Sequence, residues 1–387
     1  MRGMSTGSDQ PPRVALISSG LGHVMRGIET WMTELATHLP AALPVELWSG
    51  GPPPVQVARR KRCLYALRRE ALLLKPFNWH RRYLIEQLSV LPWALLWLRW
   101  GRIEVAYCGD PALSWHLKGF RRWHRAKVVF SDGMRLSPNW ERDFDGVHLL
   151  APAYLEAARR EVLPANFDRF FAVPYFVDVN HFRPAQAEER AQARERFRLN
   201  GRAFVILNVG PVGQVSGKRL DFLIREAARL GAAVELVSAG VDEDGALEVR
   251  ALGRQLLGPP MRFLGVVDRA WMPALFQAAD VYALAALQEP FSIAILEALA
   301  CGIPVIYNPE EMRAWQVGDG GVAVSMTEPG AAAAMFERLK QDAAWRAKLG
   351  RQARALAVSR YAPEIVCRQL TEALVRVSRR PTQPGAE

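Results

Sequence analysis

Two glutamates with a spacing suited to ligand binding lie in the segment QEPFSIAILEALACGIPV, residues 288–305. Seven residues separate Glu289 from Glu297, and the apolar run after Pro290 ends at the helix-stop residue Gly302. The pattern predicts one carboxylate just outside a helix N-terminus and the other about two turns inside it. The unpaired N–H groups of a helix start favour an anion. We therefore expect a phosphate between two acceptors for hydroxyl groups, the parts that a nucleotide sugar presents.

A glycine-rich turn, VGPVGQVSGKR at 209–219, follows a predicted strand. It resembles a phosphate-binding P-loop but departs from it twice. Gly213 and Gly217 enclose three residues rather than four, and Arg219 stands where the magnesium-binding Ser or Thr should be. What remains is a turn that delivers Lys218 and Arg219, two cations able to neutralise a diphosphate leaving group. A solvated turn is the alternative.

In the first half of the chain, a second glycine-bearing loop precedes a predicted helix. Gly20 and Gly22 follow the first strand, but the dinucleotide fingerprint requires its third glycine at the position of Met25. The loop is better explained by a close approach of the backbone to a ligand, with Arg26 and Glu29 at the start of the helix. For Glu29, an acidic first turn that complements the helix dipole is an alternative.

Two aspartates end predicted strands in the first half, and we expect no metal site. Asp110 and Asp132 are candidates for acceptor contact because strand C-termini of parallel sheets face the binding crevice. Turn-forming aspartates explain them equally well. His116, His124 and His148 lack metal-ligand spacing, and no acidic cluster of the DxD type occurs. The sequence predicts a metal-independent protein without a cofactor.

The elements that position these residues alternate between strands and helices in both halves of the chain. Strands are expected at 14–19, 45–48, 103–108 and 127–131, and again at 203–210, 234–240, 261–267, 281–286 and 303–308. Helices are expected at 27–39, at 112–123 and from about 220. This alternation predicts two α/β domains with doubly wound parallel sheets and a binding cleft between them. The hinge is expected at 174–184, where proline, asparagine and aspartate interrupt the pattern.

The positive charge of the chain is confined to its first third. Residues 1–140 hold 20 Lys and Arg against nine Asp and Glu, which accounts for the whole net charge of +11. Within 55–82 the apolar residues Leu64, Leu67, Ala71 and Leu74 share one helical stripe, which predicts a basic amphipathic helix. A solvated face, contact with anionic lipid and recognition of an anionic acceptor all remain open. No nucleic-acid module accompanies the charge, so we expect no nucleic-acid partner.

The expected location is the cytoplasm. The N-terminal residues are polar rather than signal-like, and the four cysteines form no CxxC pair. The strongest apolar stretch, 90–98, is far shorter than the roughly 20 residues of a membrane span. A peripheral position at the inner face of the membrane follows if the basic segment binds lipid.

The chain resembles retaining glycosyltransferases of family 4, which have the GT-B fold. EPFSIAILEALACGIPV is similar to the E-x7-E signature of that family, and PYFVDVNHFRP to its interdomain segment. RFLGVV before the signature and VGDGG after it also match. The resemblance covers nearly the whole chain and is densest from Phe204 to Gly321.

By this resemblance, several residues acquire expected roles. Glu297 would bind the ribose hydroxyls and Glu289 the transferred sugar, while Lys218 and Arg219 would stabilise the departing diphosphate. The remaining donor contacts would come from Gly210, the backbone of Phe291 and Ser292, and Gly27 in a loop shared with Glu29. The chain departs from the family at Ser292 and Arg26, where glycines are usual, and at Pro211, where an arginine is usual.

Together these observations predict a retaining, metal-independent glycosyltransferase of glycoconjugate biosynthesis that uses a nucleotide-diphosphate sugar. The first Rossmann-like domain should span 1–180 and bind the acceptor, with the C-terminal helix 362–378 packed back on it. The second should span 181–361 and bind the donor, and 380–387 should be a disordered tail. The alternatives are a sugar-nucleotide epimerase or hydrolase of the same fold, and a non-catalytic nucleotide-sugar-binding partner protein.

Overall fold

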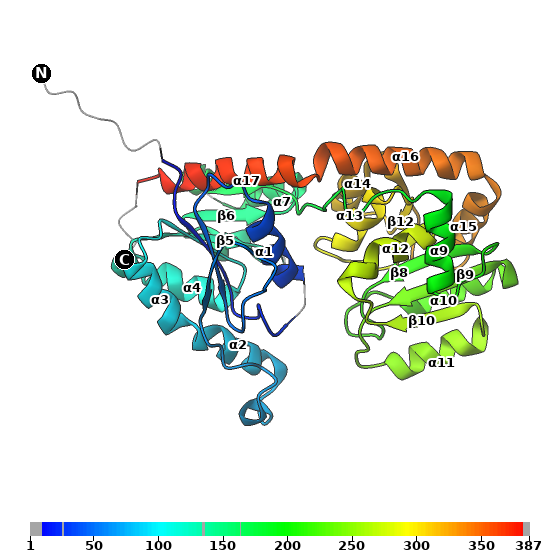
Figure 1. Cartoon of the computed structure of the whole chain (residues 1–387), viewed down its shortest axis with the longest axis horizontal. Coiled ribbons are helices and arrows are strands. Elements are labelled where there is room, and N and C mark those ends of the chain that lie inside the picture. Colours follow the sequence, from blue (N-terminus) through cyan, green and yellow to red (C-terminus); the bar gives the residue numbers. More distant parts are fainter. Residues whose placement is uncertain (1–9, 25–26, 134–135, 163, 382–387) are drawn as a thin grey trace, which may run out of the picture. The chain divides into compact units, whose positions relative to one another are not determined.

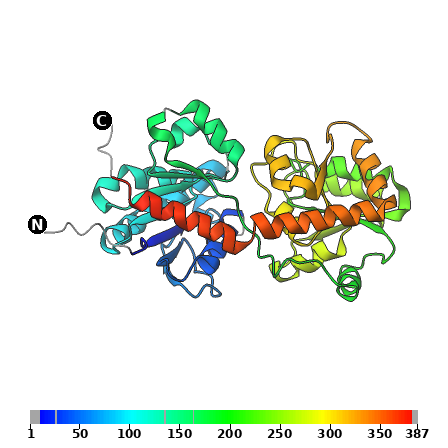
Figure 2. The ribbon, with the colours of Figure 1, turned by 90° about the horizontal axis from the view of Figure 1, so that it is seen from above.

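A computed structural model describes residues 10–24, 27–133, 136–162 and 164–381 (Figure 1). The chain folds into two compact units. The first contains the chain up to Tyr175 together with the segment from Glu364, and the second runs from Phe176 to Pro363. The C-terminal helix α17 (Pro363–Ser378) therefore belongs almost entirely to the first unit, and Figure 2 shows it in red along that unit.

A seven-stranded parallel sheet forms the centre of the first unit, in the order β3-β2-β1-β4-β5-β6-β7. Its strands are β1 (Val14–Ser18), β2 (Val45–Ser49), β3 (Arg60–Cys63), β4 (Val105–Cys108), β5 (Lys127–Ser131), β6 (Gly146–Leu149) and β7 (Phe170–Ala172). Every residue of β1, β2, β4 and β5 is buried. Most of their residues are apolar because helices cover both faces of a parallel sheet. In Figure 1, α7 and α17 lie on one side of this sheet and α3 and α4 on the other.

The helices of the first unit often begin with proline, whose fixed φ suits the first helical turn. The helices are α1 (Gly27–His38), η1 (Leu72–Leu74), α2 (Trp79–Ser89), α3 (Leu91–Trp100), α4 (Pro111–Gly119), α5 (Arg121–His124), α6 (Pro138–Glu141), α7 (Pro152–Glu161) and α8 (Pro164–Phe167). Proline stands in the first turn of α3, α4, α6 and α7. None of the helices in the described ranges is long and apolar enough to cross a bilayer.

The prediction of a basic amphipathic helix across 55–82 is wrong. Its first part forms the edge strand β3, where Arg62 lies opposite Trp48 of β2 and donates a hydrogen bond to Glu46 at 2.8 Å. Tyr65 then takes a left-handed conformation, with φ of 55°, that a helix does not allow. A new helix, α2, starts only after Asn78, whose side chain accepts from the Arg81 backbone N–H at 3.0 Å. Pairing with a sheet edge has overridden the local helical periodicity.

A six-stranded parallel sheet forms the centre of the second unit, in the order β10-β9-β8-β11-β12-β13. Its strands are β8 (Phe204–Val209), β9 (Val234–Ala239), β10 (Met261–Gly265), β11 (Val281–Leu284), β12 (Val305–Tyr307) and β13 (Gly321–Ala323). The helices are α9 (Ala187–Arg196), α10 (Leu220–Ala228), η2 (Gly231–Ala233), α11 (Ala246–Leu256), η3 (Arg269–Trp271), α12 (Met272–Ala278), α13 (Ile293–Ala300), α14 (Glu311–Val317), η4 (Gly318–Gly320), α15 (Ala331–Gln341) and α16 (Ala343–Arg360).

The hydrophobic core of the second unit lies between this sheet and α10, α11 and α15. Leu223, Val249 and Phe336 from these helices pack against Ile206 and Ala283 of the central strands. α12 and α13 contact one another, and α13 also packs on α16. The prediction of two Rossmann-like parallel-sheet domains is confirmed. The strands β3, β6, β7 and β13 were not predicted.

Candidate active site

The sheet order of the second unit brings two of the predicted motifs together. β8 and β11 are neighbours at the point where the strand order reverses, and ligands of open α/β sheets bind beside the carboxyl ends of such strands. The chain leaves β8 through Gly210 towards Lys218, and it leaves β11 towards Glu289 and α13. Two loops that are about 70 residues apart in sequence therefore meet at one edge of the sheet.

Lys218 and Glu289 form an ion pair in this crevice. Lys218 Nζ lies 2.5 Å from Glu289 Oε2, and each side chain is 15% exposed. The stem of Lys218 lies across Gly210, where a Cβ atom would stand 3.2 Å from Lys218 Cε. Gly210 also has φ of 154°, which disfavours any other residue. The glycine thus leaves room for a lysine that carries its charge to the end of the sheet.

The N-terminus of α13 follows Glu289 in sequence after three residues. Ser292 is the capping residue, but its side chain makes no cap hydrogen bond. The N–H groups of the first turn therefore remain available to an anion. Ser292 has φ of −107°, an extended conformation that any residue adopts, so the serine found in place of the family's glycine causes no backbone strain. Its carbonyl accepts from Gln316 at 2.8 Å, and both Phe291 and Ser292 are buried.

Glu297 lies about one turn inside α13 rather than the two turns expected, because the helix begins only at Ile293. It is buried and forms an ion pair with Arg269 of η3. The Arg269 guanidinium also lies over the ring of Phe182 at 4.9 Å. Sequence reasoning missed Arg269, because nothing in its local sequence marks it as a partner of a glutamate 28 residues away.

Arg219 has other partners than the Lys218–Glu289 pair. It adopts a left-handed conformation with φ of 53° just before α10. Its guanidinium donates to the carbonyl of Met326 at 2.5 Å and lies over the ring of Phe222. The two adjacent cations of the glycine-rich turn therefore have different surroundings, and the structure brings Lys218 alone of the two to Glu289.

The first unit repeats this arrangement at the carboxyl edge of β1 and β4. Glu29 lies in the first turn of α1, which Gly27 opens, and it is buried beneath Gly20. A Cβ atom on Gly20 would stand 2.3 Å from Glu29 Oε1, so the carboxylate would have to move if another residue stood here. Asp110 accepts from the Ser19 backbone N–H at 2.6 Å, and burial raises its pKa. Arg26 lies outside the described residues.

A buried ion network that the sequence did not reveal adjoins Glu29. Arg69 pairs with Glu86, and His23 Nε2 lies 2.9 Å from the same carboxylate. Burial opposes ionisation of Glu86, but hydrogen bonds from His23 and Arg69 outweigh it and lower its pKa to about 2. Arg69 also lies over the ring of Tyr83, whose hydroxyl donates to Asp110 at 3.4 Å. The network joins β1, α2 and β4 at one site.

Asp132 follows β5 and is buried, and it faces a second carboxyl group, Glu141 of α6. Burial and the nearby charge of Asp132 raise the pKa of Glu141 to about 10. Glu141 is therefore protonated at neutral pH. Two carboxyl groups so close together cannot both ionise at low cost, so this pair holds one proton.

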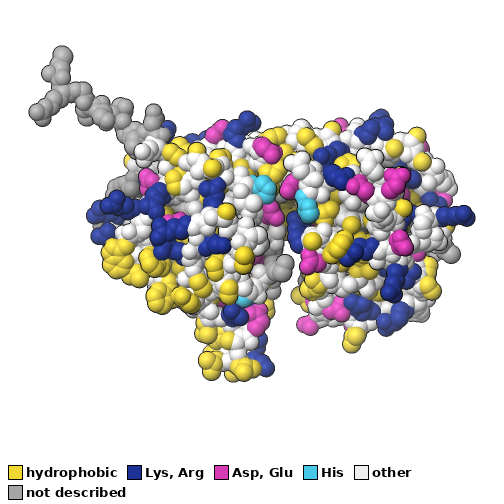
Figure 3. All heavy atoms as spheres, in the orientation of Figure 1, with side chains coloured by type: hydrophobic (Ala, Val, Ile, Leu, Met, Phe, Trp, Pro, Cys, Tyr) yellow, Lys and Arg dark blue, Asp and Glu magenta, His cyan; other side chains and the backbone are white. Residues whose placement is uncertain are grey.

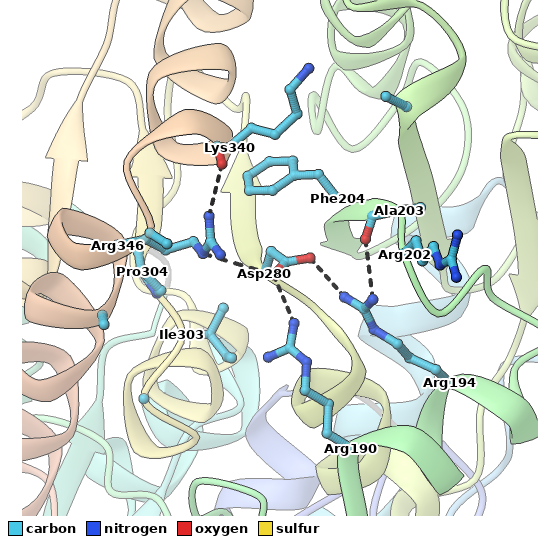
Figure 4. Close-up of a pocket in the computed structure, with 14 residues that line it drawn as sticks. Arg190, Arg194, Arg202, Ala203, Phe204, Asp280, Ile303, Pro304, Lys340 and Arg346 are labelled. Atoms are coloured by element: carbon cyan, nitrogen blue, oxygen red, sulfur yellow. Dashed lines mark hydrogen bonds and ion pairs between the residues drawn. The ribbon is translucent and has the colours of Figure 1, made fainter. Parts of the chain in front are cut away.

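A pocket of about 550 Å³ lies at the opposite, amino edge of the second sheet (Figure 4). Asp280 stands just before β11 and accepts from Arg190 and Arg194 at 2.8 Å each. Arg346 lies 3.8 Å from Asp280 and also donates to the Leu339 carbonyl. Because the arginines nearest Asp280 pair with it and with backbone carbonyls, the cluster acts mainly to join α9 and α16 to the sheet. Among the described residues, no group of His, Cys, Asp and Glu side chains is placed to hold a metal ion.

Comparison with known proteins agrees with this geometry. Residues 203–342 match the family described as Glycosyl transferases group 1. A D-inositol 3-phosphate glycosyltransferase of Salinispora arenicola is 34% identical over 195 residues, covering 46% of this chain and 43% of that protein. O-antigen chain mannosyltransferase B of Escherichia coli is 33% identical over 86 residues, which are 22% of this chain and 23% of the relative. The chain thus spans less than half the length of these relatives.

Solved structures resemble nearly the whole chain. Sucrose-phosphate synthase from Thermosynechococcus elongatus has a TM-score of 0.78 at 20% identity, covering 95% of this chain and 99% of that one. Anabaena HepE in complex with UDP-glucose has a TM-score of 0.75 at 17% identity, covering 94% and 100%. These likenesses show the fold, which is that of the GT-B glycosyltransferases, and the group 1 match lies within the second unit.

Proposed function

We propose that the chain, whose residues 203–342 form a group 1 glycosyltransferase domain, transfers a sugar from a nucleotide-diphosphate donor to an acceptor hydroxyl. We further propose that it belongs to family 4 of these enzymes, retains the configuration at the transferred carbon and requires no metal ion. The nucleotide of first choice is uridine diphosphate, because HepE, a structural relative, is seen with UDP-glucose.

The observation that carries this proposal is the arrangement at the carboxyl edge of β8 and β11. Lys218, its partner Glu289 and the uncapped start of α13 are gathered there, with Glu297 one turn inside the helix. A cation and a helix N-terminus can together stabilise the negative charge that develops on a departing diphosphate. Buried glutamates beside them can accept hydrogen bonds from sugar hydroxyl groups.

In the proposed mechanism, Lys218 leaves Glu289 when the donor binds and turns its charge to the diphosphate. Glu289, freed from the ion pair, accepts a hydroxyl of the transferred sugar. Glu297 accepts the ribose hydroxyls, and Arg269 holds its carboxylate in place. Gly27 is proposed for the donor, and Glu29, Asp110 and Asp132 for the acceptor side. The leaving phosphate takes up the acceptor proton.

The substitution Lys218→Met tests this assignment. We expect kcat/KM for sugar transfer to fall at least about 100-fold, because the diphosphate loses its cation. Lys340→Met in α15 removes a lysine of the same unit that pairs with Glu337, and it should keep full activity. Wild-type turnover by Lys218→Met would refute the site. Binding of donor without turnover on any acceptor would instead indicate a non-catalytic partner, and rapid donor loss without acceptor a hydrolase.

Retention of configuration and metal independence are each tested by a separate measurement. We expect nuclear magnetic resonance of the product to show the anomeric configuration of the donor. Activity should survive dialysis against a chelator, since the leaving-group charge is met by Lys218 and the helix start. An inverted product or loss of activity that a divalent cation restores would contradict retention or metal independence.

We also propose that the protein works at the inner face of the membrane, through the segment 55–82. Although this segment is not a helix, it exposes Leu72 and Leu73 at 75% and 80%. The exposed cations Lys75 and Arg81 follow these leucines in sequence, which suits an anionic bilayer surface. Leu72→Ser/Leu73→Ser should reduce sedimentation with anionic vesicles, and unchanged sedimentation would exclude contact by this segment. Arg59 and Arg62 are unsuitable for this test, because their side chains donate hydrogen bonds within the unit. Arg59 donates to the Ala36 carbonyl and Arg62 to Glu46.

A further inference from the structure

A strongly basic pocket lies at the amino edge of the first sheet, away from the proposed acceptor side. Its volume is about 610 Å³. Residues before or at the start of β1, β4 and β5 line it, together with the ends of α3, α5 and α17. Its cations are Arg13, Arg99, Arg102, Arg125, Lys127 and Arg380. The carboxylate in its lining is Glu104, so positive charge greatly exceeds negative charge.

Half of these cations have partners within the fold, and half do not. Arg13 pairs with Glu46 at 3.2 Å, Lys127 with Asp145 at 3.8 Å and Arg380 with Asp168 at 3.6 Å. By contrast, the side chains of three arginines make no hydrogen bond or ion pair with any residue of the described ranges: Arg99, Arg102 and Arg125. These three guanidinium groups are available to an external anion.

The same surroundings disfavour further positive charge. Burial lowers the pKa of Lys127, and the nearby cations Arg121, Arg169 and Arg380 lower it further against the opposing effect of Asp145. A group of cations that repel one another gains from an anion that enters between them.

Two of the free arginines have a costly backbone conformation. Arg102 has φ of 53° shortly after α3, and Arg125 has φ of 66° at the end of α5. Glycine is usual at such left-handed helix ends, and another residue there is strained. The conformation places a charged side chain at the pocket where glycine would suit the fold better.

Exposed aromatic side chains adjoin the lining residues in sequence: Trp100 follows Arg99, and Trp123 precedes His124. Trp100 is 65% exposed and Trp123 is 45% exposed, and their rings meet edge to face at 6.3 Å. Phe120, just before α5, is 47% exposed. Figure 3 shows hydrophobic side chains gathered over α3 next to a patch of Lys and Arg. Tryptophan with adjacent arginine is typical of surfaces that sit at a membrane–water interface.

We propose that this pocket binds the phosphate of an anionic phospholipid, with Trp100 and Trp123 placed among the headgroups. This inference rests on the proposed position of the protein at the membrane through residues 55–82. It adds a binding site for a lipid headgroup that other residues form. A soluble phosphate would need the arginines but would leave the exposed indoles without a role. The lipid uses both.

The test is sedimentation with vesicles of phosphatidylcholine alone and of phosphatidylcholine mixed with phosphatidylglycerol. The key variant is Arg102→Gly/Arg125→Gly. It removes two charges and also relieves the left-handed strain, so its thermal midpoint should equal or exceed that of the wild type. We expect wild type to bind the mixed vesicles, and the variant to bind them about 25-fold more weakly, at about fivefold for each charge.

Matched variants separate this site from general charge effects and from a soluble ligand. Arg225→Ala/Arg254→Ala removes two exposed arginines from helices α10 and α11 of the second unit and should bind vesicles like wild type. Trp100→Ser/Trp123→Ser should weaken vesicle binding while leaving binding of inorganic phosphate unchanged.

Three results would overturn the proposal. The first is equal vesicle binding by Arg102→Gly/Arg125→Gly and wild type. The second is unchanged vesicle binding by the tryptophan variant together with competition by inorganic phosphate, which would indicate a soluble anion. The third is no binding of wild type to either vesicle, which would also refute membrane contact through 55–82. None of these three results would bear on the proposed sugar transfer, which is measured separately with a soluble donor.

Discussion

At the scale of single residues, the surroundings give four buried or half-buried glutamates different chemical states. Glu289 faces Lys218, and Glu297 faces Arg269. Glu86 is held ionised by His23 and Arg69, whereas Glu141 meets another carboxyl group and keeps its proton. The partner of each glutamate decides what that side chain can accept or donate.

Glu297→Gln should weaken binding of a uridine-diphosphate sugar by about 10-fold to 100-fold, because a charged hydrogen-bond acceptor becomes neutral. The glutamine carbonyl can still accept from Arg269, so the thermal midpoint should change little. Isothermal titration calorimetry gives the affinity. The control is Glu337→Gln, which changes a half-buried glutamate of α15 that pairs with Lys340. This variant should bind the donor like wild type. If both variants bind equally, Glu297 does not contact the donor.

Glu141→Gln should stabilise the protein at neutral and alkaline pH. The pKa of Glu141 rises from 4.5 to about 10 on folding, so the stability it contributes is complete below pH 4.5 and is lost as pH rises towards 10. An amide donates to Asp132 without taking up a proton. We expect a gain on the order of 2 kcal/mol near pH 7 that vanishes near pH 4.

Urea unfolding at a series of pH values measures this gain. The difference between variant and wild type should grow with pH. A difference that does not depend on pH would show that Glu141 is ionised in the native protein.

At the scale of elements, glycine-bearing loops set the positions of the charged groups at both sheets. Gly20 admits the carboxylate of Glu29, and Gly210 admits the stem of Lys218. The crossover from strand to helix then carries each charged group to the carboxyl edge of its sheet, where parallel strands end together. The loop geometry therefore matters as much as the side chain that it delivers.

Gly210→Ala should lower both stability and activity. Its Cβ would crowd the Lys218 stem at 3.2 Å, and φ of 154° is unfavourable for alanine. We expect a loss of roughly 1–2 kcal/mol in unfolding free energy and a lower kcat. Gly201→Ala is the matched control, because a Cβ there meets no atom within 4 Å. Chemical unfolding and steady-state kinetics measure both effects. An active, stable Gly210→Ala would show that Lys218 does not depend on this glycine.

At the scale of the whole molecule, one topology occurs twice with different charge. Both sheets have a central pair of strands, β1 with β4 and β8 with β11, where the order reverses. The residues 1–140 carry the entire net charge of +11, while the rest of the chain is neutral. This division agrees with a second unit that binds the donor and a first unit that meets an anionic surface.

Uridine diphosphate should protect the two units unequally against hydrogen exchange. We expect slower exchange at 210–222 and at the start of α13, with little change in β1, β4 and their loops, because ligand binding stabilises the unit that holds the ligand. Mass spectrometry of peptic fragments gives the comparison. Protection that begins in the first unit would contradict the assignment of the donor to the second.

Local patterns in the sequence were sufficient to predict the two α/β units, most of the central strands and the motif from Glu289 to Glu297. Strand runs and helix periodicity depend on neighbouring residues, so they can be recognised without knowing the fold. The pairs Lys218–Glu289, Arg269–Glu297 and Arg69–Glu86 could not be predicted in this way. They join residues far apart in sequence, and only the order of the strands determines which loops meet. For the same reason the segment 55–82 became an edge strand and a new helix: a hydrogen-bonded partner strand outweighs a local helical stripe.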